Sequence, residues 1–500
     1  METIQHSTLE EIIKNRYEEL KTLRTQGVEV YPHRFSLTHN VEEARAAAPG
    51  SKVICTGRIV QLRLMGKAAF AHLQDMSGKI QIYIKKDSLG EAPYDFFKKH
   101  IHVGDYTGVE GKMFTTHTGE TTINVEKITL LSKAIRPLPE KWHGLQDTEI
   151  RFRARHLDLL SSEEVRKIFA MRSKILRAIR NTLDEEGFLE VETPTLTPSA
   201  GGASATPFVT THNALKMNMY LRIALELYLK RLIIGGMERV YEIGKVFRNE
   251  GIDTRHNPEF TMLEAYQAYT DYEGMAHLLE NIFEACTEAL GREEVEYNGN
   301  TISLKTPFRK LYLPELWKET TGEDIHNVLN GKSFNREALL SLAKKVHAEH
   351  DANTPSAKLF DRIFDARILP LLVQPAFVMD YPTAITPLAK CKPGDECLVE
   401  RFEFFAAAGE IANAYTELND PEDQLGRLRE QMRQHDAENN DEADIIDRDF
   451  IDAMEAGMPP TGGIGIGIDR ITMLLTGQPS IREVVLFPTL KDLGKNTPQK

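Results

Sequence analysis

The chain has 500 residues, of which 41% are hydrophobic and 27% are charged, and the absence of any run near eighteen apolar residues excludes a membrane-spanning helix. The N-terminal stretch METIQHSTLEEIIKNRYEEL carries charges where a signal peptide needs an apolar core, so we expect a cytoplasmic protein. Four cysteines without CxxC spacing argue against a disulfide framework or a structural zinc site and favour reduced thiols: Cys55, Cys286, Cys391 and Cys397.

The formal net charge of −13 is unevenly distributed. Residues 1–150 carry 20 Lys and Arg against 19 Asp and Glu, which leaves 41 against 55 for residues 151–500. Residues 51–100 alone carry nine basic and four acidic side chains. A small basic module therefore precedes a large acidic one, and the basic module is the part suited to contact phosphates. A basic surface that is merely solvated is the alternative.

The first 26 residues predict a helix, because apolar residues recur at steps of three and four. From Val53 to Lys85 the period changes to two and predicts three strands, followed by a helix over Asp87–His100 and two strands over Val103–Ser132. This is the element order of an OB-fold barrel, which binds single-stranded nucleic acid by stacking bases on aromatic side chains. Phe70 fits such a platform, although an aromatic residue in a strand more often belongs to a core.

A linker from Ala134 to Gly144 carries two prolines and ends the barrel. We therefore expect an N-terminal domain over residues 1–140, made of the helix and the OB-fold, and a second domain over residues 141–500. In the second domain long helices alternate with short strands, so a multidomain α+β protein is expected.

Three short motifs are tempting but fail. Asn330–Ser333 (NGKS) has His326 where a P-loop needs its first glycine, and Gly462–Arg470 (GGIGIGIDR) lacks the spacing of a dinucleotide fingerprint. His347–His350 (HAEH) lacks the order of a zinc hydrolase motif and is expected on a helix surface.

The segment Arg239–Tyr269 predicts a strand, a polar loop and a second strand, with Arg248 at the end of the first. In the second strand Phe260, Met262, Glu264 and Tyr266 share one face, because side chains alternate. A buried carboxylate without a partner is costly, so this face makes a poor core. A cationic group of a ligand would supply the partner.

Three glutamates, at positions 403, 410 and 417, occur in the otherwise apolar strands of Arg401–Asp420. Strand alternation places Asn413, Tyr415 and Glu417 together, with Glu410 on the opposite side unless a bulge intervenes. Clustered carboxylates suit Mg²⁺ bound together with substrate phosphates. The alternative is that these glutamates face solvent.

Gly462–Gly477 has glycines at alternate strand positions, followed by Asp469, Arg470 and a helical run. Such glycines allow a ligand or another backbone to approach closely, and Arg470 would point into the space. The alternative is a tightly packed junction with a surface arginine. Together with Arg248, the glutamates and Phe260, the pattern indicates an ATP site of neither P-loop nor Rossmann kind.

These residues resemble the motifs of class II lysyl-tRNA synthetases of the bacterial type, nearly from end to end. Arg151–Thr193, followed by Pro194, resembles the first motif, which forms a dimer interface. FRNEG with RHNPEFTMLEAY resembles the second motif, and GIGIDR resembles the third. The resemblance implies an N-terminal OB-fold β-barrel that binds the anticodon, and a catalytic domain built on an antiparallel β-sheet flanked by helices.

The resemblance also implies roles for individual residues. Arg248 would contact the ATP α-phosphate and the amino acid carboxylate, and Arg470 would hold the γ-phosphate; these two are the expected catalytic groups. Phe260 would stack on adenine, and Glu403 and Glu410 would bind Mg²⁺. The remaining ATP contacts would come from Glu250, His256 and Asn257.

For the amino acid, Gly202 and Glu226 would receive the α-amino group. The implied pocket for the lysine side-chain ammonium consists of Glu264, Tyr266, Asn413, Tyr415 and Glu417. In the barrel, the implied anticodon contacts are Phe70, Gln81 and Glu120.

The implied reaction is ATP-dependent formation of lysyl-adenylate from L-lysine, followed by transfer of lysine to the 3′-end of tRNA(Lys). The absence of a Ser/His/Asp or Cys/His arrangement is no objection, because positioning and charge neutralisation suffice for this displacement. Aspartyl- and asparaginyl-tRNA synthetases are the nearest alternatives, but an aspartate pocket needs a cation, whereas Glu264 and Glu417 offer anions. A regulatory paralogue without activity is a third interpretation. The apolar stripe of the first motif fits a homodimer or an internal core equally well: Ile168, Met171, Ile175 and Leu176.

Overall fold

The computed structural model describes residues 8–138, 147–199, 201–202, 205–351, 353–437 and 447–491. The chain divides into two compact units, Met1–Ser162 and Glu163–Lys500. Helices α5 (Thr148–Arg153) and α6 (Arg155–Ser161) group with the first unit. The domain boundary near residue 140 stays a prediction.

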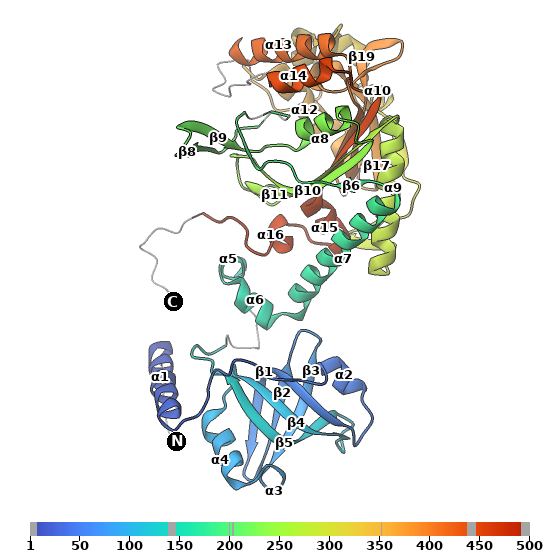
Figure 1. The fold of residues 1–500 in the computed structure, drawn as a ribbon. Helices are drawn as coiled ribbons and strands as arrows, with labels where there is room; N and C mark the ends of the chain where they lie inside the picture. Colours follow the sequence, from blue (N-terminus) through green and yellow to red (C-terminus); the bar gives the residue numbers. More distant parts are fainter. Residues whose placement is uncertain are drawn as a thin grey trace. The chain divides into compact units, whose positions relative to one another are not determined.

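The first unit contains the barrel that the sequence predicts (Figure 1). Its five strands close in the order β1-β2-β3-β5-β4, in which β3 and β5 are parallel and the other pairs antiparallel. The helices between β3 and β4 complete the expected order of an OB-fold. The elements are α1 (Leu9–Thr25), α2 (Val41–Ala46), β1 (Lys52–Met65), β2 (Ala68–Gln74), β3 (Lys79–Lys85), α3 (Lys86–Leu89), α4 (Glu91–His100), β4 (Tyr106–Thr115) and β5 (Thr121–Ser132).

Alternation along the strands decides which side chains fill the barrel. Ala69, Ala71 and Leu73 of β2 are buried in its core, so the intervening Phe70 lies on the outer face. The predicted helix over residues 1–26 is observed as α1, with residues 1–7 outside the described residues. It begins with a capping box formed by Thr8 and Glu11.

A buried lysine fixes α1 beside the barrel. Lys133 is fully buried, and its Nζ lies 3.0 Å from Asp105 Oδ2 and 3.3 Å from Glu19 Oε2 of α1. It also donates to the carbonyl of His100 at 2.6 Å. A buried ammonium is tolerated only with such partners, so the α1 position is tied to this cluster.

The second unit is built on a large sheet in the order β14-β17-β19-β20-β21-β11-β10-β6, with β18 paired to β19. The expected antiparallel sheet is confirmed through its centre, whereas the outer pairs β14/β17 and β10/β6 are parallel, which makes the sheet mixed. Its strands are β6 (Leu189–Glu190), β10 (Arg239–Phe247), β11 (Glu259–Ala268), β14 (Arg309–Tyr312), β17 (Ala376–Pro382), β18 (Cys391–Lys392), β19 (Asp395–Ala406), β20 (Gly409–Thr416) and β21 (Thr461–Gly467).

Helices and smaller sheets surround this sheet (Figure 1). The helices are α7 (Glu163–Glu185), α8 (Glu226–Ile234), α9 (Tyr272–Leu290), α10 (Leu313–Thr321), α11 (Arg336–Lys345), α12 (Ser356–Arg367), α13 (Pro421–Ala437), α14 (Arg448–Glu455), α15 (Ile468–Thr476) and α16 (Ile481–Val484), with 3-10 turns η1 (Ile325–Val328), η2 (Leu369–Leu371) and η3 (Thr383–Ile385). The small sheets are β7 (Leu196–Thr197) with β9 (Met217–Leu221) and β8 (Val209–His212), β12 (Glu294–Tyr297) with β13 (Asn300–Ser303), and β15 (Leu329–Asn330) with β16 (Ser333–Phe334).

The two faces of the central strands have different partners. Leu263, Ala265, Ile464 and Ile466 join the main core with α7, α9 and α15. On the opposite face, α8 packs through Leu225 and Leu229 against β10 and β11. The second face leaves space for a ligand, because α8 covers only part of it.

The apolar stripe of α7 lies largely inside the unit. Ile175 is completely buried in the main core, with Leu176 packed against it, and Ile168 packs with Met171 against Met473. This stripe is therefore an internal core, one of the two interpretations that the sequence leaves open.

Two of the rejected motifs have ordinary structural roles. Asn330 and Ser333 pair across the β15–β16 hairpin. His347–His350 was expected on a helix surface, and this is wrong: α11 ends at Lys345, and His347 lies in the following turn with φ of 58°. No described helix combines the length and the apolar character needed to cross a membrane.

Candidate active site

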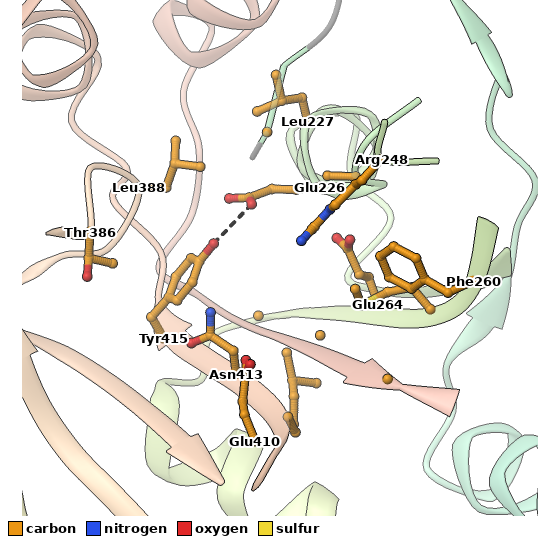
Figure 2. A pocket seen from close by; sticks show the side chains of 18 of the residues that line it. Glu226, Leu227, Arg248, Phe260, Glu264, Thr386, Leu388, Glu410, Asn413 and Tyr415 are labelled. Carbon is orange, nitrogen blue, oxygen red and sulfur yellow. Dashed lines mark hydrogen bonds between the residues drawn. The ribbon is translucent and has the colours of Figure 1, made fainter. Parts of the chain in front are cut away.

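A cavity of about 480 Å³ lies on the face of the sheet that carries α8 (Figure 2). With the exception of Glu403, every residue that the sequence assigns to the catalytic site lines it: Gly202, Glu226, Arg248, Glu250, His256, Asn257, Phe260, Glu264, Tyr266, Glu410, Asn413, Tyr415, Glu417 and Arg470. These residues come from segments far apart in the chain, so the fold brings the predicted set together.

Strand β11 supplies one wall. As the alternation predicts, Phe260, Met262, Glu264 and Tyr266 line the cavity. Arg248 follows the end of β10, and its guanidinium lies 5.3 Å from the centre of the Phe260 ring. Burial lowers the pKa of Arg248 from its very high ordinary value, while Glu250 and other nearby carboxylates oppose that shift.

Glu264 is 6% exposed and already hydrogen-bonded. The backbone N–H of Leu225 donates to its Oε1 at 3.0 Å, and the Tyr266 hydroxyl donates to its Oε2 at 3.0 Å. Burial, reinforced by the negative charge of Glu226, raises the pKa of Glu264 to about 7. A cation in the cavity would favour its ionised form.

Glu226 and Glu417 share a buried cation that the sequence interpretation missed. Lys230 Nζ lies 2.5 Å from Glu226 Oε1 and also forms an ion pair with Glu417. The Tyr415 hydroxyl donates to the other oxygen of Glu226 at 2.9 Å (Figure 2). The spacing of four residues between Glu226 and Lys230 on one helix was the available signal, because such residues are neighbours on a helix surface.

A β-bulge brings Glu410 to the cavity. Phe404 pairs with Ala412 whereas Phe405 pairs with Glu410, so Ile411 is an extra residue in β20. The bulge returns Glu410 to the face that carries Asn413 and Tyr415. The sequence placed Glu410 on the face of Asn413 and Tyr415 only if a bulge intervened, and that bulge is present.

Glu403 lies behind the cavity wall. It accepts hydrogen bonds from the Tyr381 hydroxyl at 3.0 Å and from Arg401 Nη2 at 2.5 Å. Burial raises the pKa of Glu403 to about 7, with Arg401 opposing the shift and the charge of Glu410 adding to it. Tyr381 and Arg401 thus hold the Glu403 carboxylate behind the residues that line the cavity.

Carboxylate oxygens such as those of Glu403 and Glu410 suit a divalent cation that takes its other ligands from phosphates. Glu410 already lines the cavity, whereas Glu403 would have to leave Tyr381 and Arg401 to reach it. Arg470 Nη1 donates to Glu410 Oε2 at 2.7 Å and, despite burial, holds the pKa of that carboxyl below its usual range. Within the described residues, no group of three or more His, Cys, Asp and Glu side chains could hold a metal by itself.

The loop after β10 contributes polar groups near Arg470. His256 Nε2 lies 3.4 Å from Arg470 Nη2, and its Nδ1 lies 2.8 Å from Asp253 Oδ2. Asn257 bridges the loop to the C-terminal segment, because its Nδ2 donates to the carbonyl of Glu259 and its Oδ1 accepts from the N–H of Thr489. Arg255 and Arg401 also line the cavity, although the sequence interpretation gave them no role.

Strand β21 forms the floor, with glycines facing the cavity and isoleucines facing the core. Gly463 pairs with Tyr266 on one side and with Tyr415 on the other. A Cβ at Gly463 would overlap Glu417 Oε1 and come within 2.5 Å of the Tyr266 ring. Gly463 is therefore required for the close approach of Glu417.

The three anticodon residues that the sequence predicts lie together on the barrel. The ring of Phe70 contacts that of Tyr83, its partner across β2 and β3, with ring centres 4.8 Å apart and planes tilted by 33°. Gln81 Nε2 donates to Glu120 Oε2 at 2.7 Å, and the other oxygen of Glu120 lies 3.2 Å from His72. A ring platform beside donors and acceptors is suited to an unpaired base.

The barrel and the cavity define a class of enzyme. Residues 147–491 match the family described as tRNA synthetases class II (D, K and N), and residues 53–131 match the family described as an OB-fold nucleic acid binding domain. Within this class, the lysine–tRNA ligase of Moorella thermoacetica is 48% identical over 480 residues, which cover 95% of this chain and 97% of the relative. The lysine–tRNA ligase of Enterococcus faecalis is 48% identical, over 95% of this chain and 96% of the relative. That of Staphylococcus aureus is 46% identical, over 95% of this chain and 97% of the relative. The chain belongs to the lysine–tRNA ligase family of class II tRNA synthetases.

We predict that Gly463→Ala destabilises the protein by about 1–3 kcal/mol, because the added methyl group overpacks a buried contact with Glu417 and Tyr266. Gly465→Ala is the matched control: its Cβ would meet Met262 Sδ at 3.6 Å, an ordinary contact. It should be neutral or stabilising by up to about 1 kcal/mol. Chemical unfolding of both variants measures the difference, and equal stabilities would contradict the packing argument.

Proposed function

We propose that this chain activates L-lysine with ATP to form lysyl-adenylate and then transfers lysine to the 3′-end of tRNA(Lys). The observation that carries this proposal is the set of three buried carboxylates, Glu226, Glu264 and Glu417, beside Arg248 in one cavity. Such a site favours an amino acid with two ammonium groups and one carboxylate. The family membership and the names of the relatives support the same substrate.

In this proposal Arg248 binds the carboxylate of the amino acid, and Gly202 and Glu226 receive its α-amino group. Glu264 and Glu417 surround the side-chain ammonium, and the remaining contacts come from Tyr266, Asn413 and Tyr415. Arg401 supports this arrangement, because its Nε donates to Asn413 Oδ1 at 3.0 Å and leaves the amide Nδ2 to face outward.

ATP occupies the other end of the cavity in this proposal. Phe260 stacks on adenine, with Glu250, His256 and Asn257 around the base and phosphates. Arg248 and Arg470 bind the phosphates as delocalised cations with several donors each. When bound, Mg²⁺ neutralises phosphate charge, and Glu403 and Glu410 are the residues that would hold it.

The chemistry needs no side-chain nucleophile. The lysine carboxylate attacks the α-phosphorus of ATP, and pyrophosphate leaves. The terminal ribose hydroxyl of the tRNA then attacks the lysyl carbonyl, and AMP leaves. Arg248 accelerates the first step by holding the attacking carboxylate and the α-phosphate together and by neutralising their charge.

The tRNA contact belongs to the barrel in this proposal, with Phe70, Gln81 and Glu120 at the anticodon. A homodimer is also proposed: large apolar side chains of the β6–β9 region are exposed, which marks an interaction surface. They are Leu189, Leu196, Val209, Leu215 and Met217. A cytoplasmic location is part of the same proposal, because ATP and tRNA are the substrates.

ATP–pyrophosphate exchange, run with each amino acid separately, tests the proposed substrate. We expect exchange with L-lysine, because only a side-chain ammonium balances the buried acids. Exchange that depends on aspartate or asparagine would instead indicate a sister synthetase. Absence of exchange with every amino acid would indicate an inactive paralogue.

We predict that the KM for lysine falls about tenfold between pH 6 and pH 8, because Glu264, with a pKa of about 7, must be ionised to pair with an ammonium. Below pH 7 this carboxyl is protonated and binding weakens; above pH 7 the gain levels off. Glu264→Gln should reduce this pH dependence, because it removes one of the titrating carboxyls, and should lower kcat/KM for lysine by about a hundred-fold to a few thousand-fold, since breaking a buried ion pair costs about 3–5 kcal/mol.

Glu259→Gln is the matched control for that measurement, because Glu259 lies on the same strand but its side chain is 51% exposed. It should keep both the pH profile and the lysine KM. The KM for ATP should survive in both variants. An equal loss of ATP affinity in Glu264→Gln would show that Glu264 does not belong to the amino acid pocket.

For the barrel, we predict that Phe70→Ala lowers kcat/KM for tRNA aminoacylation roughly five- to hundredfold, because a stacked base contributes about 1–3 kcal/mol. ATP–pyrophosphate exchange, which involves no tRNA, should be unchanged in the same preparation. A loss in both reactions would show that Phe70 supports folding rather than the anticodon contact.

A further inference from the structure

Lys230 is a cation at the amino acid end of a site whose substrate carries two cations. Its side chain is fully buried, does not line the cavity, and projects from α8 behind the wall that Glu226 and Glu417 form. A positive charge in this place would repel a diammonium ligand unless it were neutralised. The arrangement therefore needs an explanation beyond a cluster of acids.

The ammonium of Lys230 joins the two carboxylates. Its Nζ donates to Glu226 Oε1 at 2.5 Å and forms an ion pair with Glu417 Oε2. The aromatic rings of Tyr415 and Phe450 lie 5.6 and 6.0 Å from the same nitrogen, so it is enclosed by acids and ring faces. Lys230 therefore bridges the two carboxylates.

Both carboxylates keep capacity for a ligand. Glu226 Oε2 faces the cavity, where it accepts the Tyr415 hydroxyl (Figure 2). Apart from its ion pair with Lys230, the carboxylate of Glu417 accepts no hydrogen bond from any residue that the structure describes. Its Oε1 lies over Gly463, on the cavity floor.

The charges balance for one kind of ligand. When all three are ionised, Glu226, Glu264 and Glu417 contribute three negative charges, and Lys230 cancels one of them. The two that remain equal the two ammonium groups of lysine, while Arg248 matches the carboxylate of the substrate. Without Lys230, a third buried carboxylate would have no cation, which a low-dielectric site tolerates only by taking up a proton or by moving.

We propose that Lys230 is a positioning residue that sets amino acid specificity, because it holds Glu226 and Glu417 at a fixed separation and adjusts the pocket to the charge of a diammonium substrate. This inference rests on the proposed function. It assigns to Lys230 no contact with the substrate and no part in the chemical step.

Lys230→Met tests the proposal, because methionine has a similar length and no charge. We expect the KM for L-lysine in ATP–pyrophosphate exchange to rise about ten- to hundredfold. At saturating lysine, kcat should change by less than about threefold and the KM for ATP should not change, since the variant loses binding of the amino acid alone.

Lys133→Met is the matched control, because Lys133 is also a fully buried lysine paired with carboxylates but belongs to the barrel unit. It should lower stability without changing the KM for lysine. An unchanged lysine KM in Lys230→Met, or a fall in kcat with both KM values unchanged, would overturn the proposal. If the wild type shows no lysine-dependent exchange, the proposed function itself fails, which is a separate outcome.

If Lys230→Met yields no folded protein, a crystal structure of the wild type with bound L-lysine decides. The proposal requires that Lys230 Nζ keeps both ion pairs while the ligand side-chain ammonium contacts Glu417 or Glu264. A ligand ammonium that replaces Lys230 on Glu226 or Glu417 would overturn it.

Discussion

The catalytic unit depends on one electrostatic constraint: three carboxylates are buried within one cavity wall and must be compensated. Glu226, Glu264 and Glu417 are at most 6% exposed, and burial together with mutual repulsion raises the pKa of Glu264 and of Glu417. The protein compensates one charge with Lys230 and satisfies Glu264 with two hydrogen bonds. The rest of the compensation comes from protonation, which the raised pKa values favour, or from a cationic ligand, so the free protein holds a binding site at a cost to its own stability.

The sheet can hold this site because one of its faces packs in the main core and the other lines the cavity. Leu263, Ala265, Ile464 and Ile466 point into the main core and supply the apolar burial that fixes the strands. The residues between them point into the cavity. A single bulge at Ile411 then changes the phase of β20, so that Glu410 joins Asn413 and Tyr415 without disturbing the core side of the strand.

Part of this arrangement is predictable from the sequence because strand alternation is a local property. The face shared by Phe260, Glu264 and Tyr266 follows from period two alone, and the order of elements in the barrel follows from the same pattern. The bulge could only be stated as a condition, because it depends on how β19 and β20 pair. Whether the α7 stripe forms a core or an interface likewise depends on what packs against it.

The positions of two residues, Glu403 and Lys230, could not be predicted from local sequence patterns. Glu403 is on the expected strand, but its partners Tyr381 and Arg401 hold it behind the cavity, and only the register of β17 with β19 brings Tyr381 to it. Lys230 reads from the sequence as an ordinary helical lysine. Its contact with Glu417 joins positions 187 residues apart in the chain, so no spacing rule reports it.

The resident lysine also changes how specificity in this family should be understood. The absence of a cation was the sequence argument against an aspartate pocket, yet the structure contains one in Lys230. What excludes an anionic side chain is therefore the excess of carboxylates over that cation. If Lys230 acts as proposed, specificity resides in the charge balance of the cavity wall rather than in any single contact with the ligand.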